Sequence, residues 1–145
     1  MAAQSPRAQA FARDARVGGA IAAGGAIGAI ARWAIEREWP AAPGGFPTAT
    51  FAINVVGCAA IGVLMVLLEE VLRGRVYVRP LVGVGFLGGF TTFSAFAVET
   101  RALVGNHPAV ALLYFIGTPT VAVLAAILGA SVATWATGPR VSSPA

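Results

Sequence analysis

The sequence predicts an all-α integral membrane protein with four transmembrane helices, the third of which is broken in the middle of the membrane. Of the 145 residues, 57% are hydrophobic and 11% are charged, whereas a soluble domain of this size is about 25% charged. Four apolar segments each reach the roughly 17–25 residues that a spanning helix needs. The connectors between them are short, so we expect a single domain without a soluble part.

The predicted helices span residues 17–35, 48–68, 81–104 and 109–136, within one transmembrane domain of residues 17–137. Residues 1–16 are polar and are expected to form a tail or a short surface helix. They do not show the short apolar core and small-residue cleavage site of a signal peptide. Residues 138–145 are expected to form a C-terminal tail.

The first two helices contain small residues that suit close helix packing and polar residues that need hydrogen-bond or ionic partners within a membrane. Gly24 and Gly28 in the first helix have the four-residue spacing that lets helix backbones approach closely. Arg32, near the end of this helix, either snorkels to the lipid headgroups or provides an ion pair or a positive field at a pore mouth. Asn54 in the second helix either bonds to another helix or faces a pore as a hydrogen-bond donor.

The third apolar segment is interrupted by the run Gly-Gly-Phe-Thr-Thr-Phe-Ser-Ala-Phe-Ala-Val-Glu, residues 88–99. The bilayer core offers no water to freed backbone groups. A break in this place therefore persists only where it lines a cavity, binds an ion or is buried in protein. We expect the break near residues 88–92, where freed carbonyl oxygens suit a hard cation such as sodium.

The segment after the break has the groups needed to accept a small anion. Phe93 and Phe96 are three residues apart and share a helix face, and aromatic ring edges are electropositive. Asn54, Ser94, Thr92 and Thr118 could supply donors in place of the anion's water. Two phenylalanines at this spacing are also common in an ordinary core, so the pattern alone leaves both interpretations open.

The fourth helix begins after His107 with Pro108, a residue that suits the first helical turn. Tyr114 and Thr118 are four residues apart and share a face. Threonine hydroxyls in membrane helices also bond to their own backbone, which is the alternative for Thr118.

Charge and rare residues exclude several functions. The positive residues are ten arginines and no lysine, mostly at helix ends, where anchoring and orientation are expected rather than nucleic-acid binding. One cysteine, Cys58, and one histidine do not form a transition-metal cluster or an internal disulfide. A nucleophile elbow, a P-loop and a dinucleotide fingerprint are not found. We therefore do not expect an enzyme.

The run from Gly88 to Phe96 resembles the Gly-Gly-x-Thr-Thr-Phe-Ser-x-Phe signature of the Fluc/CrcB fluoride ion channels. Asn54, within Phe-Ala-Ile-Asn-Val-Val-Gly, and the glycine-rich first helix ending in Arg32-Trp33 are also similar to that family. The resemblance covers roughly residues 18–136.

This resemblance implies a dimer of four-helix subunits in opposite orientations, with two fluoride pathways and a central structural sodium ion. The sodium ligands would be the main-chain carbonyls of Gly88 and Thr91. The pathway residues would be Asn54, Thr92, Phe93, Ser94, Phe96, Glu99, Tyr114 and Thr118, with Arg32 as an electrostatic element. The family has a track of hydroxyl groups on the fourth helix, with which Tyr114 and Thr118 align; Pro119-Thr120 departs from its usual pattern.

The expected function is passive export of fluoride down its electrochemical gradient, which protects the cell from fluoride that enters as hydrofluoric acid. One alternative is a small proton-coupled drug exporter, but its characteristic acid deep in the first helix is missing here; another is a non-transporting scaffold. We expect a multi-pass protein of the cell membrane, a bacterial inner membrane.

The partner in the expected dimer is a second copy of the chain in the opposite orientation, or a paralogue. Seven arginines fall on one side of the membrane and three on the other, which favours cytoplasmic termini. Those on the richer side are Arg7, Arg13, Arg16, Arg73, Arg75, Arg79 and Arg140; those on the other side are Arg32, Arg37 and Arg101. Because the pore motif is complete in this one chain, we favour the homodimer.

Overall fold

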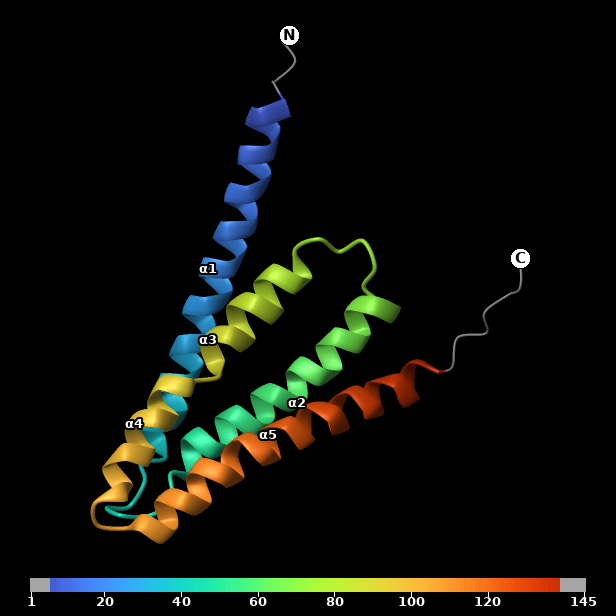
Figure 1. The fold of residues 1–145 in the computed structure, drawn as a ribbon. Coiled ribbons are helices and arrows are strands. Elements are labelled where there is room, and N and C mark those ends of the chain that lie inside the picture. The colour runs from blue at the N-terminus through green and yellow to red at the C-terminus, as the bar shows by residue number, and fades with distance from the viewer. Residues whose placement is uncertain (1–5, 139–145) are drawn as a thin grey trace.

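The structure, a computed structural model, describes residues 6–138; residues 1–5 and 139–145, and with them most of the predicted C-terminal tail, lie outside the described residues. The described chain consists of helices and their connections, with no strand (Figure 1). The elements are α1 (Pro6–Glu38), α2 (Thr48–Glu70), the π-helical segment η1 (Arg79–Leu87), α3 (Gly88–Phe90), α4 (Phe93–Val104) and α5 (Pro108–Thr137).

Four helical spans in the described chain are long and apolar enough to cross a membrane, which confirms the prediction of an all-helical four-span protein. They cover Gln9–Glu38, Thr48–Glu70, Arg79–Val104 and Pro108–Thr137. The third span is made of η1, α3 and α4 in succession. Many large apolar side chains on these spans are exposed, as is suitable for helices that face lipid.

Helix α1 begins before the predicted first span. Residues 1–16 were expected to form a tail or a short surface helix, and those from Pro6 onward are helical and continuous with the first span. Proline suits a first helical turn, and the alanines that follow are the strongest helix formers, so the helix continues where the hydropathy falls. At 33 residues and 1.5 Å per residue, α1 is about 50 Å long, well beyond the roughly 30 Å hydrocarbon core.

The four spans associate mainly as two pairs (Figure 1). Helix α1 packs along η1 and α3, and α2 packs along α5. The pairs meet chiefly where α4 packs against α5. At that contact Phe96, Leu103, Ala111 and Tyr114 form a buried cluster.

Glycine makes the close approach within both pairs possible. A side chain at Gly24 would overlap the carbonyl oxygen of Leu81, and one at Gly28 would overlap that of Phe86. In the second pair a side chain at Gly62 would overlap main-chain atoms of α5. The packing role predicted for Gly24 and Gly28 is confirmed.

Candidate functional site

The site is organised around two extended residues, Thr91 and Thr92, between α3 and α4. Thr91 has φ −74° and ψ 154°, and Thr92 has φ −145° and ψ 127°. Asn54 of α2 bonds to both main-chain groups of Thr92. Its Oδ1 accepts from the Thr92 N–H at 2.8 Å, and its Nδ2 donates to the Thr92 carbonyl at 3.0 Å. Asn54 therefore satisfies the peptide groups that the helix leaves unpaired.

Two main-chain carbonyls lose their helical donors at the same place. A continuous helix would direct the N–H of Thr92 to Gly88 and the N–H of Ala95 to Thr91. Here the Thr92 N–H goes to Asn54, and the Ala95 N–H goes to the Thr92 side chain, Oγ1, at 3.2 Å as the cap of α4. The carbonyl oxygens of Gly88 and Thr91 are thus left without these two bonds.

The hydroxyls beside the break are held locally. Thr91 Oγ1 donates to the Leu87 carbonyl at 2.8 Å, and Thr92 Oγ1 lies 3.3 Å from Ser94 Oγ. Ser94 is exposed on the single chain.

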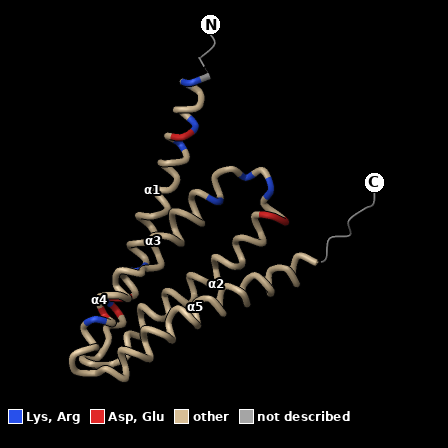
Figure 2. The backbone as a smooth tube through the Cα atoms, in the orientation of Figure 1, with Lys and Arg blue, Asp and Glu red and all other residues tan. Residues whose placement is uncertain are grey.

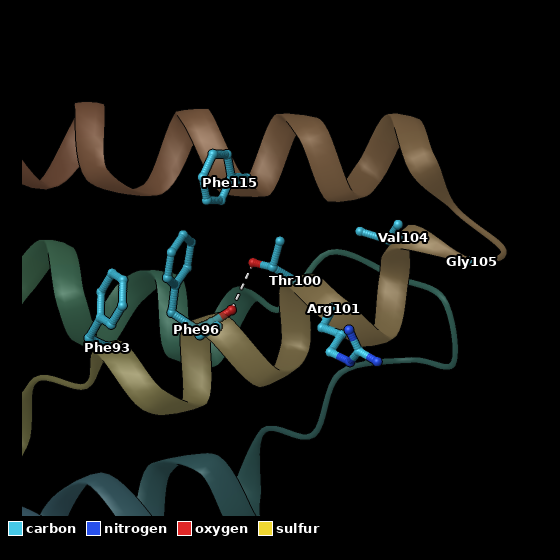
Figure 3. Close-up of a pocket in the computed structure, with 8 residues that line it drawn as sticks. Phe93, Phe96, Thr100, Arg101, Val104, Gly105 and Phe115 are labelled. Atoms are coloured by element: carbon cyan, nitrogen blue, oxygen red, sulfur yellow. Dashed lines mark hydrogen bonds between the residues drawn. The ribbon is translucent and has the colours of Figure 1, made fainter.

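Phe93 and Phe96 lie side by side on α4, with ring centroids 5.6 Å apart. They differ in burial, because Phe96 is 5% exposed and Phe93 is 79% exposed. Figure 3 shows both rings rising from α4 toward α5, where Phe115 faces them. Phe115 stacks on Phe96 at 6.1 Å. The shared face predicted from the spacing is present, and the exposed ring of Phe93 is free to meet another molecule.

Two cavities adjoin these rings. One, of about 550 Å³, runs along α4 toward Arg101 and Gly105 (Figure 3). The other, of about 530 Å³, brings together most of the predicted site; its lining includes Asn54, Thr91, Thr92, Phe93, Phe96 and Thr118.

Thr118 is the polar side chain of this second cavity that has no internal partner. It is 3% exposed, and its hydroxyl is the only buried side-chain nitrogen or oxygen atom of the described residues that makes no hydrogen bond. Thr120, two residues further on and on the opposite, exposed side of α5, instead donates to the Ile116 carbonyl at 2.7 Å. Backbone bonding therefore applies to Thr120, whereas Thr118 lines the cavity with a buried hydroxyl that has no partner.

Tyr114 and Glu99 form a separate cluster beyond Phe96. The Tyr114 hydroxyl donates to Glu99 Oε2 at 2.6 Å, and the Thr50 hydroxyl donates to Glu99 Oε1 at 2.7 Å. Tyr114 is fully buried, and its ring centroid lies 5.1 Å from that of Phe96. A small cavity of about 50 Å³ reaches Glu99 and Thr50 from the ends of α1 and α2.

Sequence reasoning missed Thr50 and Phe115. Thr50 is four residues before Asn54 and so shares its helix face, a signal that was present in the sequence. Phe115 is one of many apolar residues of α5, and only the packing of α5 on α4 distinguishes it.

Arg32 lies against the segment that precedes the break. Its Nε donates to the Gly89 carbonyl at 3.4 Å, and its Nη1 pairs with Glu36 at 3.3 Å. Both side chains are about one quarter exposed. The guanidinium thus places a partly buried positive charge beside α3, balanced by a carboxylate on its own helix. No cluster of three or more histidine, cysteine or acidic side chains that could hold a metal occurs in the described part of the chain.

Comparison with known proteins gives one consistent picture. Residues 19–130 match the family described as CrcB-like protein, Camphor Resistance (CrcB). The fluoride-specific ion channel FluC 2 of Nocardia farcinica is 48% identical over 120 residues, covering 82% of this chain and 86% of that protein. FluC 1 of Streptomyces coelicolor is 45% identical over 136 residues, covering 92% and 85%. FluC of Paracoccus denitrificans is 40% identical over 113 residues, covering 77% and 90%.

Proposed function

Since this chain belongs to the CrcB-like family, we propose that it conducts fluoride through the cavity between α2, α4 and α5. Its function is that of an ion channel of the cell membrane and not of an enzyme. Flux is passive, down the electrochemical gradient. Export of fluoride that has entered as hydrofluoric acid would protect the cell.

The unpartnered hydroxyl of Thr118 is the observation that supports this site best. A buried donor without a partner costs about 1–3 kcal/mol, a cost that a small anion in the cavity would offset. Fluoride in contact with Thr118 could also approach the edges of Phe93 and Phe96. One Nδ2 hydrogen of Asn54 is used by Thr92, and the amide has a second one to donate.

The Tyr114–Glu99–Thr50 cluster would receive the anion beyond Phe96. Both hydroxyls donate to Glu99 when no anion is near. A hydroxyl rotates freely, so either one could turn from the carboxylate to a passing fluoride. Glu99 thereby holds these donors in place without itself binding the anion.

The exposure of Phe93 supports an assembly of two chains. An exposed aromatic ring beside an open cavity suggests that a second subunit completes the wall. We infer an antiparallel dimer in which the break of each third span lies at the middle of the membrane. The second subunit is a copy of this chain, with an oppositely oriented paralogue as the alternative.

The main chain at the break has a donor set that suits sodium. The carbonyl oxygens of Gly88 and Thr91 lack their helical donors, and hard oxygen ligands match a hard cation. A sodium ion there would supply a fixed positive charge at the centre of the dimer. Thr91→Ala should retain the site because the ligand is main chain, and anomalous scattering from a heavier monovalent cation should locate it. Absence of the anomalous peak from crystals of both proteins would refute this assignment.

Fluoride efflux from liposomes tests the function directly. The purified chain, reconstituted alone, should release fluoride to an ion-selective electrode while retaining chloride. If it conducts only after co-expression with a second gene product, the paralogue replaces the copy as partner. Equal release of both halides, or release of neither under all these conditions, would refute the proposal.

A further inference from the structure

A second polar feature lies far from the break, in the connection between α2 and η1. A cavity of about 310 Å³ there is lined by Met65, Leu68, Glu69, Leu72, Arg73, Gly74, Arg75, Val76 and Arg79. Three of these residues are arginines and one is a glutamate, so the lining carries a formal charge of +2. The N-terminal part of α1, residues 6–16, projects beyond the other helices and is called here the projecting part of α1. Figure 2 shows the basic residues of the connection at the same end of the molecule as those of this part.

The local backbone brings the arginines together. Helix α2 ends at Glu70, and Arg73 Nε donates to the Glu69 carbonyl at the helix end. Gly74 then has φ +86°, a conformation that glycine adopts without strain, and the chain turns toward η1. Arg75 follows this turn and Arg79 begins η1, so the three guanidinium groups arise from one tight connection.

The cavity joins this positive rim to an apolar floor. Met65 and Leu68 belong to the last turns of α2, and Leu72 follows the end of the helix; all three line the same space as the arginines. The connection also lies where two membrane-length spans end. Spans that cross a bilayer end at the lipid headgroups, so the site would lie at that level, and Met65 and Leu68, on the last turns of α2, would lie on its acyl side.

We propose that this cavity binds the headgroup of an anionic phospholipid of the surrounding membrane. The planar guanidinium has a fork of N–H donors that matches phosphate oxygens. Basic clusters beside membrane spans attract anionic lipid in this way. The formal +2 charge favours a lipid with net negative charge, such as phosphatidylglycerol, over phosphatidylcholine, whose own cation cancels its phosphate. The apolar floor favours a phosphate that carries acyl chains over a soluble phosphate ester.

Native mass spectrometry of the purified full chain tests the site. The protein in detergent is titrated with phosphatidylglycerol or phosphatidylcholine of the same chain length. Phosphatidylglycerol should bind more tightly, and Arg75→Gln/Arg79→Gln should weaken it about 25-fold, at roughly fivefold per arginine. Arg7→Gln/Arg16→Gln removes the same charge from the projecting part of α1 and should leave the affinity within about twofold.

Each arm has an outcome that decides the proposal. Equal binding of the two lipids would overturn the proposal. An equal loss of phosphatidylglycerol affinity in the Arg75→Gln/Arg79→Gln and Arg7→Gln/Arg16→Gln variants would also overturn it, because it would show non-specific electrostatic attraction and not a defined binding site. Glycerol phosphate should not displace the lipid; full displacement at similar concentrations would identify a soluble phosphate site instead. Circular dichroism and the elution volume of each variant establish that the fold is retained, and Arg75→Lys/Arg79→Lys, with its charge kept, should recover part of the affinity.

Discussion

Replacement of Thr118 by valine separates stability from conduction. Valine keeps the shape of threonine and has a methyl group in place of the hydroxyl, which has no partner in the described chain. Because an unpaired buried hydroxyl costs about 1–3 kcal/mol, the free energy of unfolding of Thr118→Val should be equal to that of the native chain or higher by up to that amount. Removal of a buried polar group that does have a hydrogen-bond partner would instead lower the free energy of unfolding.

Conduction should change in the other direction. A hydrogen bond to a charged group contributes about 1.5–3 kcal/mol. If fluoride uses the Thr118 hydroxyl where passage is slowest, its loss should reduce efflux about ten- to 150-fold, at tenfold per 1.36 kcal/mol. Efflux is measured with a fluoride electrode on liposomes, and stability by thermal unfolding in detergent.

Two matched variants complete this test. Thr118→Ser keeps the hydroxyl and should conduct within a few-fold of the native chain. Thr120→Val removes a hydroxyl that donates to the Ile116 carbonyl on the exposed side of α5, and should conduct normally. Native efflux by Thr118→Val, or an equal loss in Thr118→Val and Thr120→Val, would show that the cavity hydroxyl does not serve the anion.

Phe93→Ile and Phe96→Ile should each slow efflux by more than tenfold in the liposome assay; Phe96→Ile, which removes a ring buried within one subunit, should lower the unfolding temperature more than Phe93→Ile. Asn54→Asp keeps an acceptor for the Thr92 N–H and should unfold at a higher temperature than Asn54→Ser, yet it should conduct less because its charge repels the anion; the opposite order in efflux would make Asn54 a clamp only. Gly28→Val should destabilise the chain by about 1–3 kcal/mol through overlap with the main chain of the third span, whereas Gly18→Val, with open space around it, should not; equal unfolding temperatures of these two variants would argue against the close packing of α1.

The four spans could be predicted from composition alone because hydrocarbon requires each helix to satisfy its own backbone, which makes every span a local property of the sequence. The beginning of α1 could not be predicted in this way. The apolar segment begins only at Val17, but helix formation depends on backbone propensity, and α1 therefore begins eleven residues earlier, at Pro6. The π-helical η1 likewise has no signal in the hydropathy pattern.

The partners of the site residues were decided by the tertiary structure. Asn54 bonds to Thr92, and Glu99 receives the hydroxyls of Thr50 and Tyr114, across helices that are distant in sequence. Thr118 and Thr120 have the same local bonding options on α5, yet Thr118 lines the cavity and has a buried hydroxyl without a partner, whereas the hydroxyl of Thr120 bonds to its own helix. The amino-acid sequence determined which polar groups enter the membrane, whereas the packing of α2 and α4 on α5 determined which of them are satisfied, because a side-chain hydrogen bond depends on positions within about 3 Å that no local pattern specifies.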